Sequence, residues 1–470
     1  MELTAAIRSG LVITPLGPQL ADVGIRDGRI VDVAAPGSLP RARREFDAEG
    51  LIVFPGLIDP HVHLGLGDTI GDDKMAEDFL YNTKDCLIGG VTTIATTTME
   101  GREPLRERFD RALRCADGRS WVDYKITSVV GNRSHIPDIR YVVDKGGVSF
   151  KFFTGLVGEQ AEEFGQDPAG ITPSLFFEAC EGIAKEGRGG YAAIHAEEPY
   201  VRAVLADRMG NDAARTDMLS AWADSSPEWA ESAQVYTYAF VAASVGVPLY
   251  VVHVSSGLTV DLIEWLQGRG LTVVGETISL FLLTTANEMD QANMGAKAKI
   301  SPPVRYEPDR LRLWRGLRDG SISIIGTDSL TYSSKFKEGV DFWDCRVGAN
   351  IQFADMLPLL WDEGVVSGRI DTMTLARALS ENAARRLRLF PRKGAIAPGS
   401  DADLAVFDPE RQLRLGVSRY RGTSDYSLWE GREVHGTPVM TFLRGDLVMK
   451  DGEVVTDSPG GKYLAYRIQG

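Results

Sequence analysis

Cysteine is scarce in this sequence: its 470 residues include only four, and no two of them form a C-x-x-C pair. The four stand far apart, at Cys86, Cys115, Cys180 and Cys345. This spacing argues against a disulfide framework and against a zinc clip made of cysteines. We therefore expect buried free thiols and a cytoplasmic location.

Long apolar runs and a surplus of basic residues are also absent. No run approaches the roughly 18–20 residues that a membrane-spanning helix requires. The opening segment MELTAAIRSGLVITP lacks the basic start and the long apolar core of a signal peptide. The formal net charge is −14, whereas a nucleic-acid or anionic-membrane partner would favour a basic face. The sequence therefore predicts a protein with neither kind of partner.

From residue 51 to about residue 330, strand-like and helix-like patterns alternate. Helical period is clearest in residues 102–116, 172–187, 226–246 and 256–270. Eight short segments have the pattern of buried strands: LIDPHVHL, VTTIATTT, YKITSVVG, VSFKFFTG, YAAIHAEE, PLYVVHVS, LTVVGETI and ISIIGTDS. Strand–helix alternation predicts a parallel sheet, and eight repeats predict an α/β fold of the closed (β/α)₈, TIM-like barrel type.

The two ends of the chain differ in character from this central block. Each is rich in β-forming residues around an Asp-Gly pair, Asp27-Gly28 and Asp451-Gly452, and this pair is typical of a hairpin turn. We expect both ends to join in one small β-sandwich domain. The predicted boundaries are 1–50 for its first part, 51–390 for a metal-dependent catalytic barrel, and 391–470 for its second part and a C-terminal tail. A linking helix is expected over residues 371–389.

Polar residues of a kind that binds metals recur on the predicted barrel strands. His61 and His63 are two residues apart on the first strand, so they share one face. The others are Lys151 on strand four, His195 on strand five, His253 on strand six and Asp328 at the end of strand eight. The carboxyl ends of barrel strands meet at one mouth, where active sites form. Imidazole and carboxylate groups are ligands that suit Zn²⁺ and its neighbours.

Each of these residues also has a simpler explanation. A single histidine on a strand is more often a hydrogen-bonded core residue. Asp328 could cap a helix, and Lys151 could be a buried salt-bridge partner or extend its ammonium to solvent. However, five strands of one barrel each offer a ligand at the same end. This coincidence favours a metal site over five unrelated explanations.

Lys151 is the least expected residue of the set, because it stands in the middle of an apolar strand. Burying an unpaired ammonium group costs several kcal/mol or lowers its pKa. An amine whose charge is suppressed by burial and by nearby cations can react with CO₂ to form a carbamate. The product, N6-carboxylysine, carries a negative charge on a long stem and could bridge two metal ions.

Several motifs together resemble those of a known family, and the resemblance runs nearly the whole length of the chain. The motifs are PGLIDPHVHL, SFKFFTG, IHAEEP, VVHVSSG, KISPPVR, IGTDS and PRKGAIAPGSDADLAVFDP. They are similar to those of the cyclic amidohydrolases, the dihydropyrimidinase/hydantoinase branch of the amidohydrolase superfamily. The resemblance implies a binuclear centre in which His61, His63, Lys151 and Asp328 hold the more buried metal. Carboxylated Lys151 would hold the second metal together with His195 and His253.

The resemblance also implies a reaction. A hydroxide bridging the two metals would attack the carbonyl carbon of a small neutral cyclic amide or imide, such as a hydantoin or a dihydropyrimidine. Asp328 would carry the proton to the departing nitrogen. The two divalent ions are expected to be zinc, with manganese, cobalt or iron as alternatives. The family further implies a homo-oligomer, a tetramer or a dimer.

The chain departs from the family pattern where the substrate would bind. Leu156 stands where dihydropyrimidinases have a tyrosine that donates to the developing oxyanion, and leucine cannot donate. The family's TCPxY segment reads TISLF here. Ser301 matches a serine whose backbone contacts the ring, and Asn350 is the candidate for an asparagine contact further along. His135 could replace the lost tyrosine, although a histidine in a surface loop is the simpler interpretation.

Several related activities remain as alternatives. Dihydroorotase is disfavoured because its carboxylate substrate needs an arginine just after H-x-H, where this chain reads LGLGD. The HFNEPG pattern of allantoinases is also missing. A hydrolase of a linear amide, a lactone or an unusual heterocycle remains open because of Leu156. A non-catalytic scaffold related to dihydropyrimidinase is less consistent with the sequence, since all six ligand residues are present.

Overall fold

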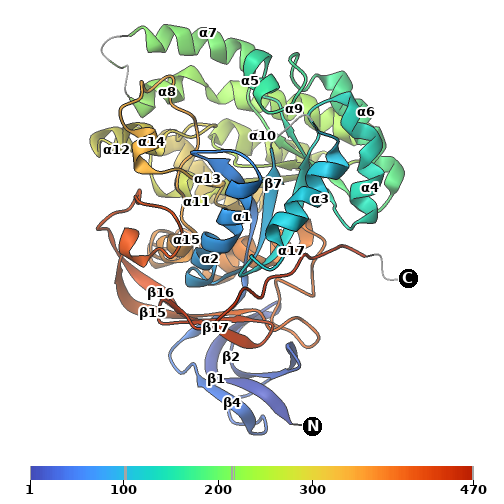
Figure 1. Cartoon of the computed structure of the whole chain (residues 1–470). Helices are drawn as coiled ribbons and strands as arrows, with labels where there is room; N and C mark the ends of the chain where they lie inside the picture. The colour runs from blue at the N-terminus through green and yellow to red at the C-terminus, as the bar shows by residue number, and fades with distance from the viewer. Residues whose placement is uncertain (1, 100–102, 213–214, 216–217, 468–470) are drawn as a thin grey trace.

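The computed structural model describes residues 2–99, 103–212, 215 and 218–467. It contains two nine-stranded sheets, one parallel and one mixed. Figure 1 shows the parallel sheet and its helices above the mixed sheet, with the N-terminus at the far end of the mixed sheet. The predicted fold class, a (β/α)₈ barrel with a smaller β domain made from both chain ends, is confirmed.

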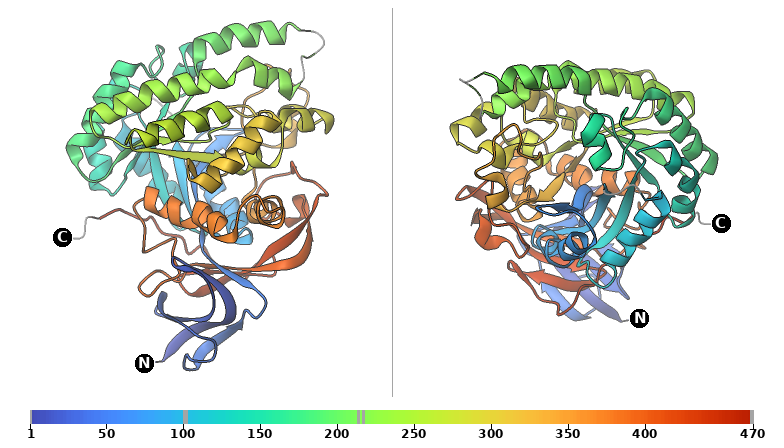
Figure 2. Two further views of the ribbon diagram at one scale, coloured as in Figure 1. Left: turned by 180° about the vertical axis from the view of Figure 1, so that it is seen from behind. Right: turned by 45° about the horizontal axis from the view of Figure 1, so that its top comes forward.

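The barrel strands follow one another in the sheet in chain order. The strands are β6 (Leu57–Gly67), β7 (Val91–Thr98), β8 (Asp123–Val129), β9 (Ser149–Phe153), β10 (Tyr191–His195), β11 (Leu249–Val251), β12 (Val273–Ile278) and β13 (Ile322–Gly326). Each overlaps one of the eight predicted segments. All neighbouring pairs are parallel, as strand–helix alternation requires. Figure 2 (right) shows the helices arranged around these strands.

A short strand that the sequence did not predict separately brings the two edges of the parallel sheet together. This strand, β14 (Ser329–Thr331), follows β13 after two residues and pairs with β6. Within the two-residue connection, the backbone N–H of Asp328 donates to the carbonyl of His61 at 2.9 Å. Residues 327–328 therefore form the seam of the barrel.

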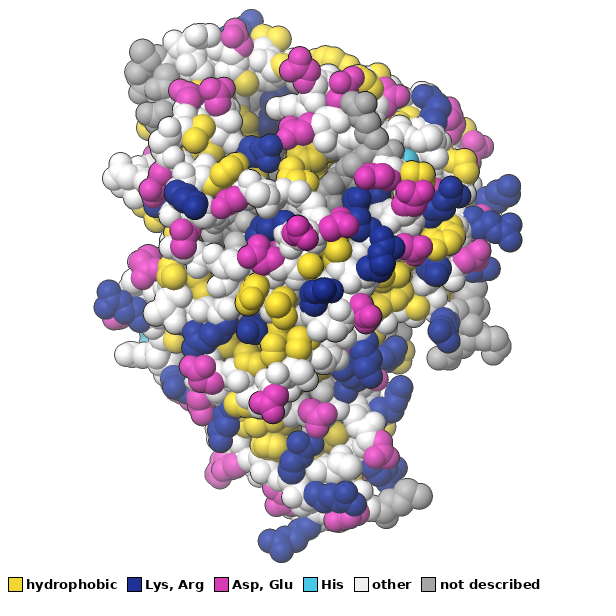
Figure 3. Space-filling view, viewed as in Figure 1, with side chains coloured by type: hydrophobic (Ala, Val, Ile, Leu, Met, Phe, Trp, Pro, Cys, Tyr) yellow, Lys and Arg dark blue, Asp and Glu magenta, His cyan; other side chains and the backbone are white. Residues whose placement is uncertain are grey.

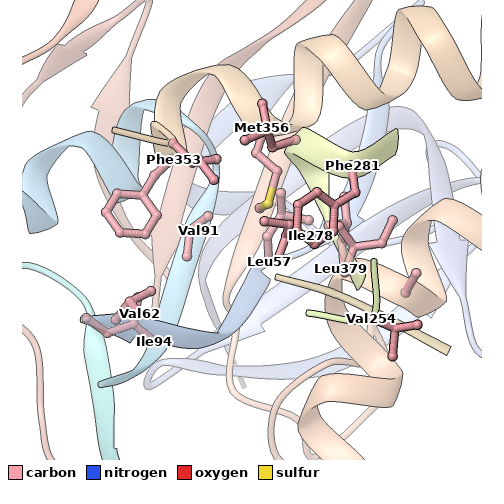
Figure 4. Packing of buried hydrophobic residues seen from close by; sticks show 14 of the residues in the cluster. Leu57, Val62, Val91, Ile94, Val254, Ile278, Phe281, Phe353, Met356 and Leu379 are labelled. Carbon is pink, nitrogen blue, oxygen red and sulfur yellow. The ribbon is translucent and has the colours of Figure 1, made fainter. Parts of the chain in front are cut away.

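The main outer helices of the barrel include α3 (Leu105–Ala116), α6 (Pro173–Glu186), α9 (Glu228–Ser244), α10 (Gly257–Gly268) and α13 (Glu307–Asp319). The predicted linking helix corresponds to three successive helical segments, α16 (Thr372–Ala376), η4 (Arg377–Glu381) and α17 (Asn382–Arg386). Figure 4 shows how helices and strands share the core: Phe353 and Met356 of α15 (Phe353–Leu360) lie near Leu57 and Val91 of the barrel. Burial of these apolar side chains is the main favourable term in folding.

The mixed sheet draws strands from both ends of the chain. Its strands are β1 (Leu3–Thr14), β2 (Gly17–Arg26), β3 (Arg29–Ala34), β4 (Ala42–Asp47), β5 (Ile52–Pro55), β15 (Leu404–Arg414), β16 (Glu433–Leu443), β17 (Asp446–Lys450) and β18 (Glu453–Val454). Both predicted hairpin turns are present, and Asp27 and Asp451 have φ values of 52° and 49°. Positive φ at both turn residues is the geometry that Asp-Gly accommodates.

A buried lysine joins the barrel to the mixed sheet. The Nζ atom of Lys393 lies 2.6 Å from Asp123 at the start of β8 and also contacts Asp401 and Asp403, beside β15. The lysine and its three carboxylate partners are all buried. These three carboxylates form a cluster that could hold a cation, and the ammonium group of Lys393 already supplies one. The C-terminal segment is fixed nearby, because Lys125 Nζ donates to the carbonyls of Gly146 and Leu464.

All four cysteines are buried and free, as the sequence predicted. Among the described residues, no helix combines the length and the apolar character needed to cross a membrane. Figure 3 shows acidic and basic side chains interspersed over the face seen in Figure 1.

Candidate metal centre

Three of the predicted ligands come together at the seam of the barrel. His61 and His63 lie on β6, and Asp328 follows β13. The Oδ1 atom of Asp328 is 3.0 Å from Nε2 of His63 and 3.3 Å from Nε2 of His61. One donor atom from each residue lies within 4.8 Å of the other two, and all three residues are buried. Two imidazoles and a carboxylate in this arrangement can hold a divalent cation.

The other three predicted ligands adjoin this group. Lys151 Nζ lies 3.1 Å from Nε2 of His61, and Nδ1 of His195 lies 2.9 Å from Nε2 of His253. The rings of His61 and His253 are 5.3 Å apart between centroids. The structure therefore brings all six residues to one place, although His253 lies two residues beyond the end of β11 rather than within a strand.

Two of these residues have unusual backbone conformations. His253 has φ 40° and Asp328 has φ 54°. Only a few per cent of non-glycine residues adopt positive φ. Such conformations cost on the order of 1–3 kcal/mol and cluster at functional sites. Both occur where a side chain must leave the end of a barrel strand and turn toward the common site.

The electrostatics of the site suit a cation. Burial, reinforced by Lys151, lowers the pKa of His61 well below its usual value, and burial and His195 do the same for the pKa of His253. Neutral imidazoles retain the lone pair that a metal ligand needs. Burial alone would raise the pKa of Asp328, but His61 and His63 outweigh it and hold that pKa below its ordinary value. Burial lowers the pKa of Lys151 to about 8.

Two buried carboxylates orient His61 from behind. Glu276 on β12 accepts from Nδ1 of His61 at 2.9 Å and from the backbone N–H of His253 at 3.2 Å. Asp59 accepts from the backbone N–H of His61 and from the hydroxyl of Thr327, across the seam. A ring partner such as Glu276 fixes the tautomer and ring orientation of a ligating histidine, whereas Asp59 fixes the backbone at His61. The sequence analysis missed both carboxylates.

Glu197, which the sequence analysis also missed, connects His195 to Arg202 and Ser301 of the cavity wall. Its carboxylate accepts from Nε2 of His195 at 2.8 Å, from Arg202 at 3.1 Å and from the hydroxyl of Ser226 at 2.6 Å. It also accepts from the hydroxyl of Ser301. Burial alone would raise the pKa of Glu197, but Arg202 and His195 outweigh it and hold that pKa far below its usual range.

A cavity of about 390 Å³ opens beside the six residues, a volume typical of small-molecule sites. His63, His195, His253 and Asp328 reach its surface. Much of the remaining wall is apolar: Leu66, Met99, Phe153, Leu156, Phe164, Ile300, Leu330 and Val347. The cavity therefore combines a potential metal site with an apolar compartment large enough for a substituted ring.

Three cations line this cavity, and each is already engaged. Arg202 pairs with Glu197, and Arg346 pairs with Glu163 at 2.7 Å. Lys299 Nζ donates to the carbonyls of Phe342, Trp343 and Cys345 at 2.6, 3.1 and 2.8 Å. Both arginines are neutralised by a carboxylate; Lys299 keeps its charge, but its ammonium group is held by neutral carbonyls, so an anionic substrate would have to displace one of these contacts. Glu163 and Asp344 add negative charge to the same wall. This arrangement favours an uncharged ligand.

The predicted substrate contacts differ in their placement. Ser301 and Leu156 line the cavity. Asn350 does not, and its side chain is occupied by the backbone of Tyr332 and by Ser424 Oγ. His135 is fully buried rather than in an exposed loop, and it contacts the backbone N–H of Gly131 and the amide of Asn132. It is not among the residues that line the cavity.

Comparison with known proteins identifies the family. The model of the amidohydrolase family matches residues 52–448, which is most of the chain. This chain belongs to the amidohydrolase family. Curated relatives and solved structures confirm that the sequence motifs resemble the hydantoinase branch of this family.

Several curated relatives of this amidohydrolase cover almost all of it. It is 30% identical to a D-hydantoinase of Geobacillus stearothermophilus, over 98% of this chain and 96% of that protein. It is 32% identical to an allantoinase of Rubrobacter xylanophilus, over 97% and 96%. Among solved structures, the L-hydantoinase (dihydropyrimidinase) from Arthrobacter aurescens superposes with a TM-score of 0.90 at 27% identity, covering 99% of this chain and 100% of that one.

Substitution of Glu197 tests whether its carboxylate supports His195, and through it the pair of His195 and His253, in this amidohydrolase. We expect Glu197→Gln to weaken metal retention by about 10–100-fold, the usual effect of removing an outer partner of a ligating histidine. The glutamine keeps the size but loses the negative charge facing His195 and Arg202. Metal content during titration with a chelator measures the change.

The adjacent Glu198 supplies the matched control. Its carboxylate accepts only from the backbone N–H of Val201, as the cap of α7 (Pro199–Gly210), among the hydrogen bonds of the described residues. Glu198→Gln should therefore retain metal like the wild type. Equal metal retention in both variants would refute the supporting role of Glu197.

Proposed function

We propose that the protein hydrolyses a ring C–N bond of a small neutral cyclic amide or imide, such as a hydantoin or a dihydropyrimidine. The observation that carries this proposal is the convergence of four histidines, Lys151 and Asp328 at the mouth of the barrel, beside a cavity whose cations are all engaged. The hydantoinase and allantoinase relatives support the same substrate class.

Two divalent ions fit the residues present. His61, His63, Lys151 and Asp328 would hold one, and Lys151, His195 and His253 would hold the other, with Lys151 as N6-carboxylysine. The lysine is buried among imidazoles, and a carbamate there would supply the negative charge that two adjacent cations require. When bound, the ions lower the pKa of water and polarise a carbonyl oxygen. Zinc is the expected metal.

The chain's own residues supply proton transfer and positioning. Asp328 takes the proton from the attacking water at its carboxylate and returns it to the ring nitrogen as the C–N bond breaks. The opened product then carries a carboxylic acid at one end and, at the other, a ureido group from a hydantoin or a dihydropyrimidine, or an amide from a cyclic imide. Ser301 lies at the cavity wall and meets the ring through its backbone. Leu156 and its apolar neighbours exclude water from one side of the substrate.

The location and assembly of the protein extend this proposal. Four free buried cysteines suit a reducing compartment, so we place the enzyme in the cytoplasm. We also expect a homo-oligomer, a tetramer or a dimer, as the resemblance to the cyclic amidohydrolases implies.

A panel of cyclic substrates tests the function. The panel holds hydantoins, dihydrouracil, allantoin and cyclic imides, together with lactones and linear amides as comparison substrates. We expect purified, metal-replete protein to open at least one of the cyclic amides or imides, with loss of ring absorbance as the measurement. Dihydroorotate should be a poor substrate, because its carboxylate would be repelled by Glu163 and Asp344 or would have to displace Arg202 or Arg346 from its carboxylate partner. Activity confined to lactones or linear amides would replace the proposal with the alternative hydrolase, and inactivity with all substrates, together with no bound metal, would favour a scaffold.

A further inference from the structure

One wall of the cavity is a segment without regular secondary structure. Residues 343–348 all line the cavity, and neither a helix nor a strand lies between α14 (Ser334–Lys337) and α15. The backbone of such a segment has no helical or ladder hydrogen bonds to fix it. Other contacts therefore determine its shape, and with it the shape of the cavity. We call residues 342–348 the wall segment.

A buried lysine, Lys299, supplies most of these contacts. Its Nζ atom donates to the carbonyls of Phe342, Trp343 and Cys345 at 2.6, 3.1 and 2.8 Å. An ammonium group has three N–H donors, so the wall segment uses all of them. The main chain of Lys299 adds a further contact, because its carbonyl accepts from the backbone N–H of Gly348 at 2.9 Å. One residue thus holds both ends of the wall segment.

A second buried lysine holds the remaining part of the wall segment. Lys337, the last residue of α14, donates from Nζ to the carbonyl of Arg346 at 2.6 Å. Each ammonium group also lies 4.4 Å from the centroid of an aromatic ring, Lys299 over Trp222 and Lys337 over Tyr332. Among the described residues, neither lysine forms an ion pair with a carboxylate. Carbonyl dipoles and ring faces therefore stabilise the two buried charges.

The carbonyls of the wall segment depend on these two lysines. No backbone N–H of the described residues donates to the carbonyl of residue 342, 343, 345 or 346. A carbonyl that is shielded from water and left without a donor costs free energy. Removal of an ammonium group should therefore make the wall segment rearrange. The candidate metal ligands lie at the strand ends and have contacts of their own, so they should stay in place.

We propose that Lys299 is a positioning residue that decides which ring substituents the cavity accepts, and that Lys337 assists it. With both ammonium groups in place, the wall segment keeps one shape, and a substituent that exceeds the space has to displace it. Lys299 does not act on the reacting atoms, because its three donors are used on carbonyls. The substrate part of this inference rests on the proposed ring hydrolysis.

Hydrogen exchange of the full chain tests the positioning role without any substrate. Lys299→Met keeps an unbranched side chain but removes all three donors. We expect it to speed exchange of the wall-segment amides by about tenfold or more, because hydrogen bonds from an ionised donor are among the stronger ones. Lys337→Met should act in the same direction near Arg346. The matched control is Lys335→Met, at an exposed lysine of α14 with no side-chain contact among the described residues, and it should leave exchange unchanged.

The substrate preference of the same variants tests the second part of the proposal. Hydantoin and 5-benzylhydantoin share a ring and differ only in the substituent. We expect Lys299→Met to raise the ratio of kcat/KM for 5-benzylhydantoin to that for hydantoin by about tenfold, the order of discrimination that a small change in pocket size produces. The change should appear mainly in KM, because the metal ligands and Asp328 keep their contacts. Lys335→Met should keep the wild-type ratio.

The outcomes separate this proposal from the proposed function. Unchanged exchange in a folded Lys299→Met variant would overturn it, and so would faster exchange with an unchanged ratio, because Lys299 would then be structural only. If no ring substrate is opened, the proposed function fails, while the exchange rates still decide whether Lys299 fixes the wall segment. Should Lys299→Met fail to fold, Lys337→Met, which removes one carbonyl contact instead of three, is judged by the same two measurements.

Discussion

Replacing Lys151 by alanine is expected to remove bound metal and to lower ring hydrolysis by roughly a thousandfold or more. The reason is that transition-state stabilisation by metal ions is worth several kcal/mol. Lys151 Nζ lies 3.1 Å from Nε2 of His61 in a fully buried position. Alanine leaves no group there that could become a negatively charged metal ligand. Elemental analysis and the rate of ring opening measure the two effects.

The Lys151 prediction has a specific rescue and a matched control. Short carboxylic acids should restore part of the metal content and activity of Lys151→Ala, because they can supply the missing carboxylate. Lys125→Met removes another fully buried lysine, whose Nζ contacts the Gly146 and Leu464 carbonyls instead of the site, and should leave the metals in place. Full activity of Lys151→Ala, or an equal metal loss in Lys125→Met, would contradict the role of Lys151.

Asp328→Asn is expected to retain metal and to lose turnover by about 10⁴-fold, since a positioned proton carrier contributes up to that factor. The amide can still donate an oxygen atom to a cation, but it cannot accept the proton of the attacking water. Steady-state kinetics and metal analysis on the same sample separate the two functions.

Asp344 supplies the comparison for Asp328. It is an exposed carboxylate that lines the same cavity, so Asp344→Asn tests whether charge in the cavity matters apart from proton transfer. We expect it to remain active within a few-fold. If Asp328→Asn turned over substrate as fast as Asp344→Asn, another group would have to carry the proton.

The fold could be predicted because apolar strands and amphipathic helices carry regular patterns. The eight strands of the barrel and the two Asp-Gly hairpins needed only local information. The short strand β14 was not separated from β13, because only Thr327 and Asp328 lie between them and the predicted strand segment ISIIGTDS ran across both. The convergence of the candidate ligands could be predicted because strand ends meet at one mouth in a barrel, whatever the details of the loops.

The supporting residues could not be predicted in the same way. Glu276 and His61 are 215 positions apart, and a single carboxylate in an apolar strand has no spacing pattern to mark it. Glu197 stands two residues after His195, which places both on one face, so this spacing could have indicated it. Asn350 and His135 depend on loop conformation, and loops carry no periodic pattern that fixes where a side chain points.

The seam of the barrel has an evolutionary consequence. Asp328 carries the proposed proton relay and also lies in the two-residue connection whose backbone ties β13 to β6. An insertion in this connection would separate β13 from β6 and would also displace the carboxylate of Asp328. We therefore expect the length of the connection to vary little among natural variants. Loop 332–348, which lines the cavity without joining the strands, is free to diversify. New substrate preferences should therefore arise in that loop while the closure of the barrel stays constant.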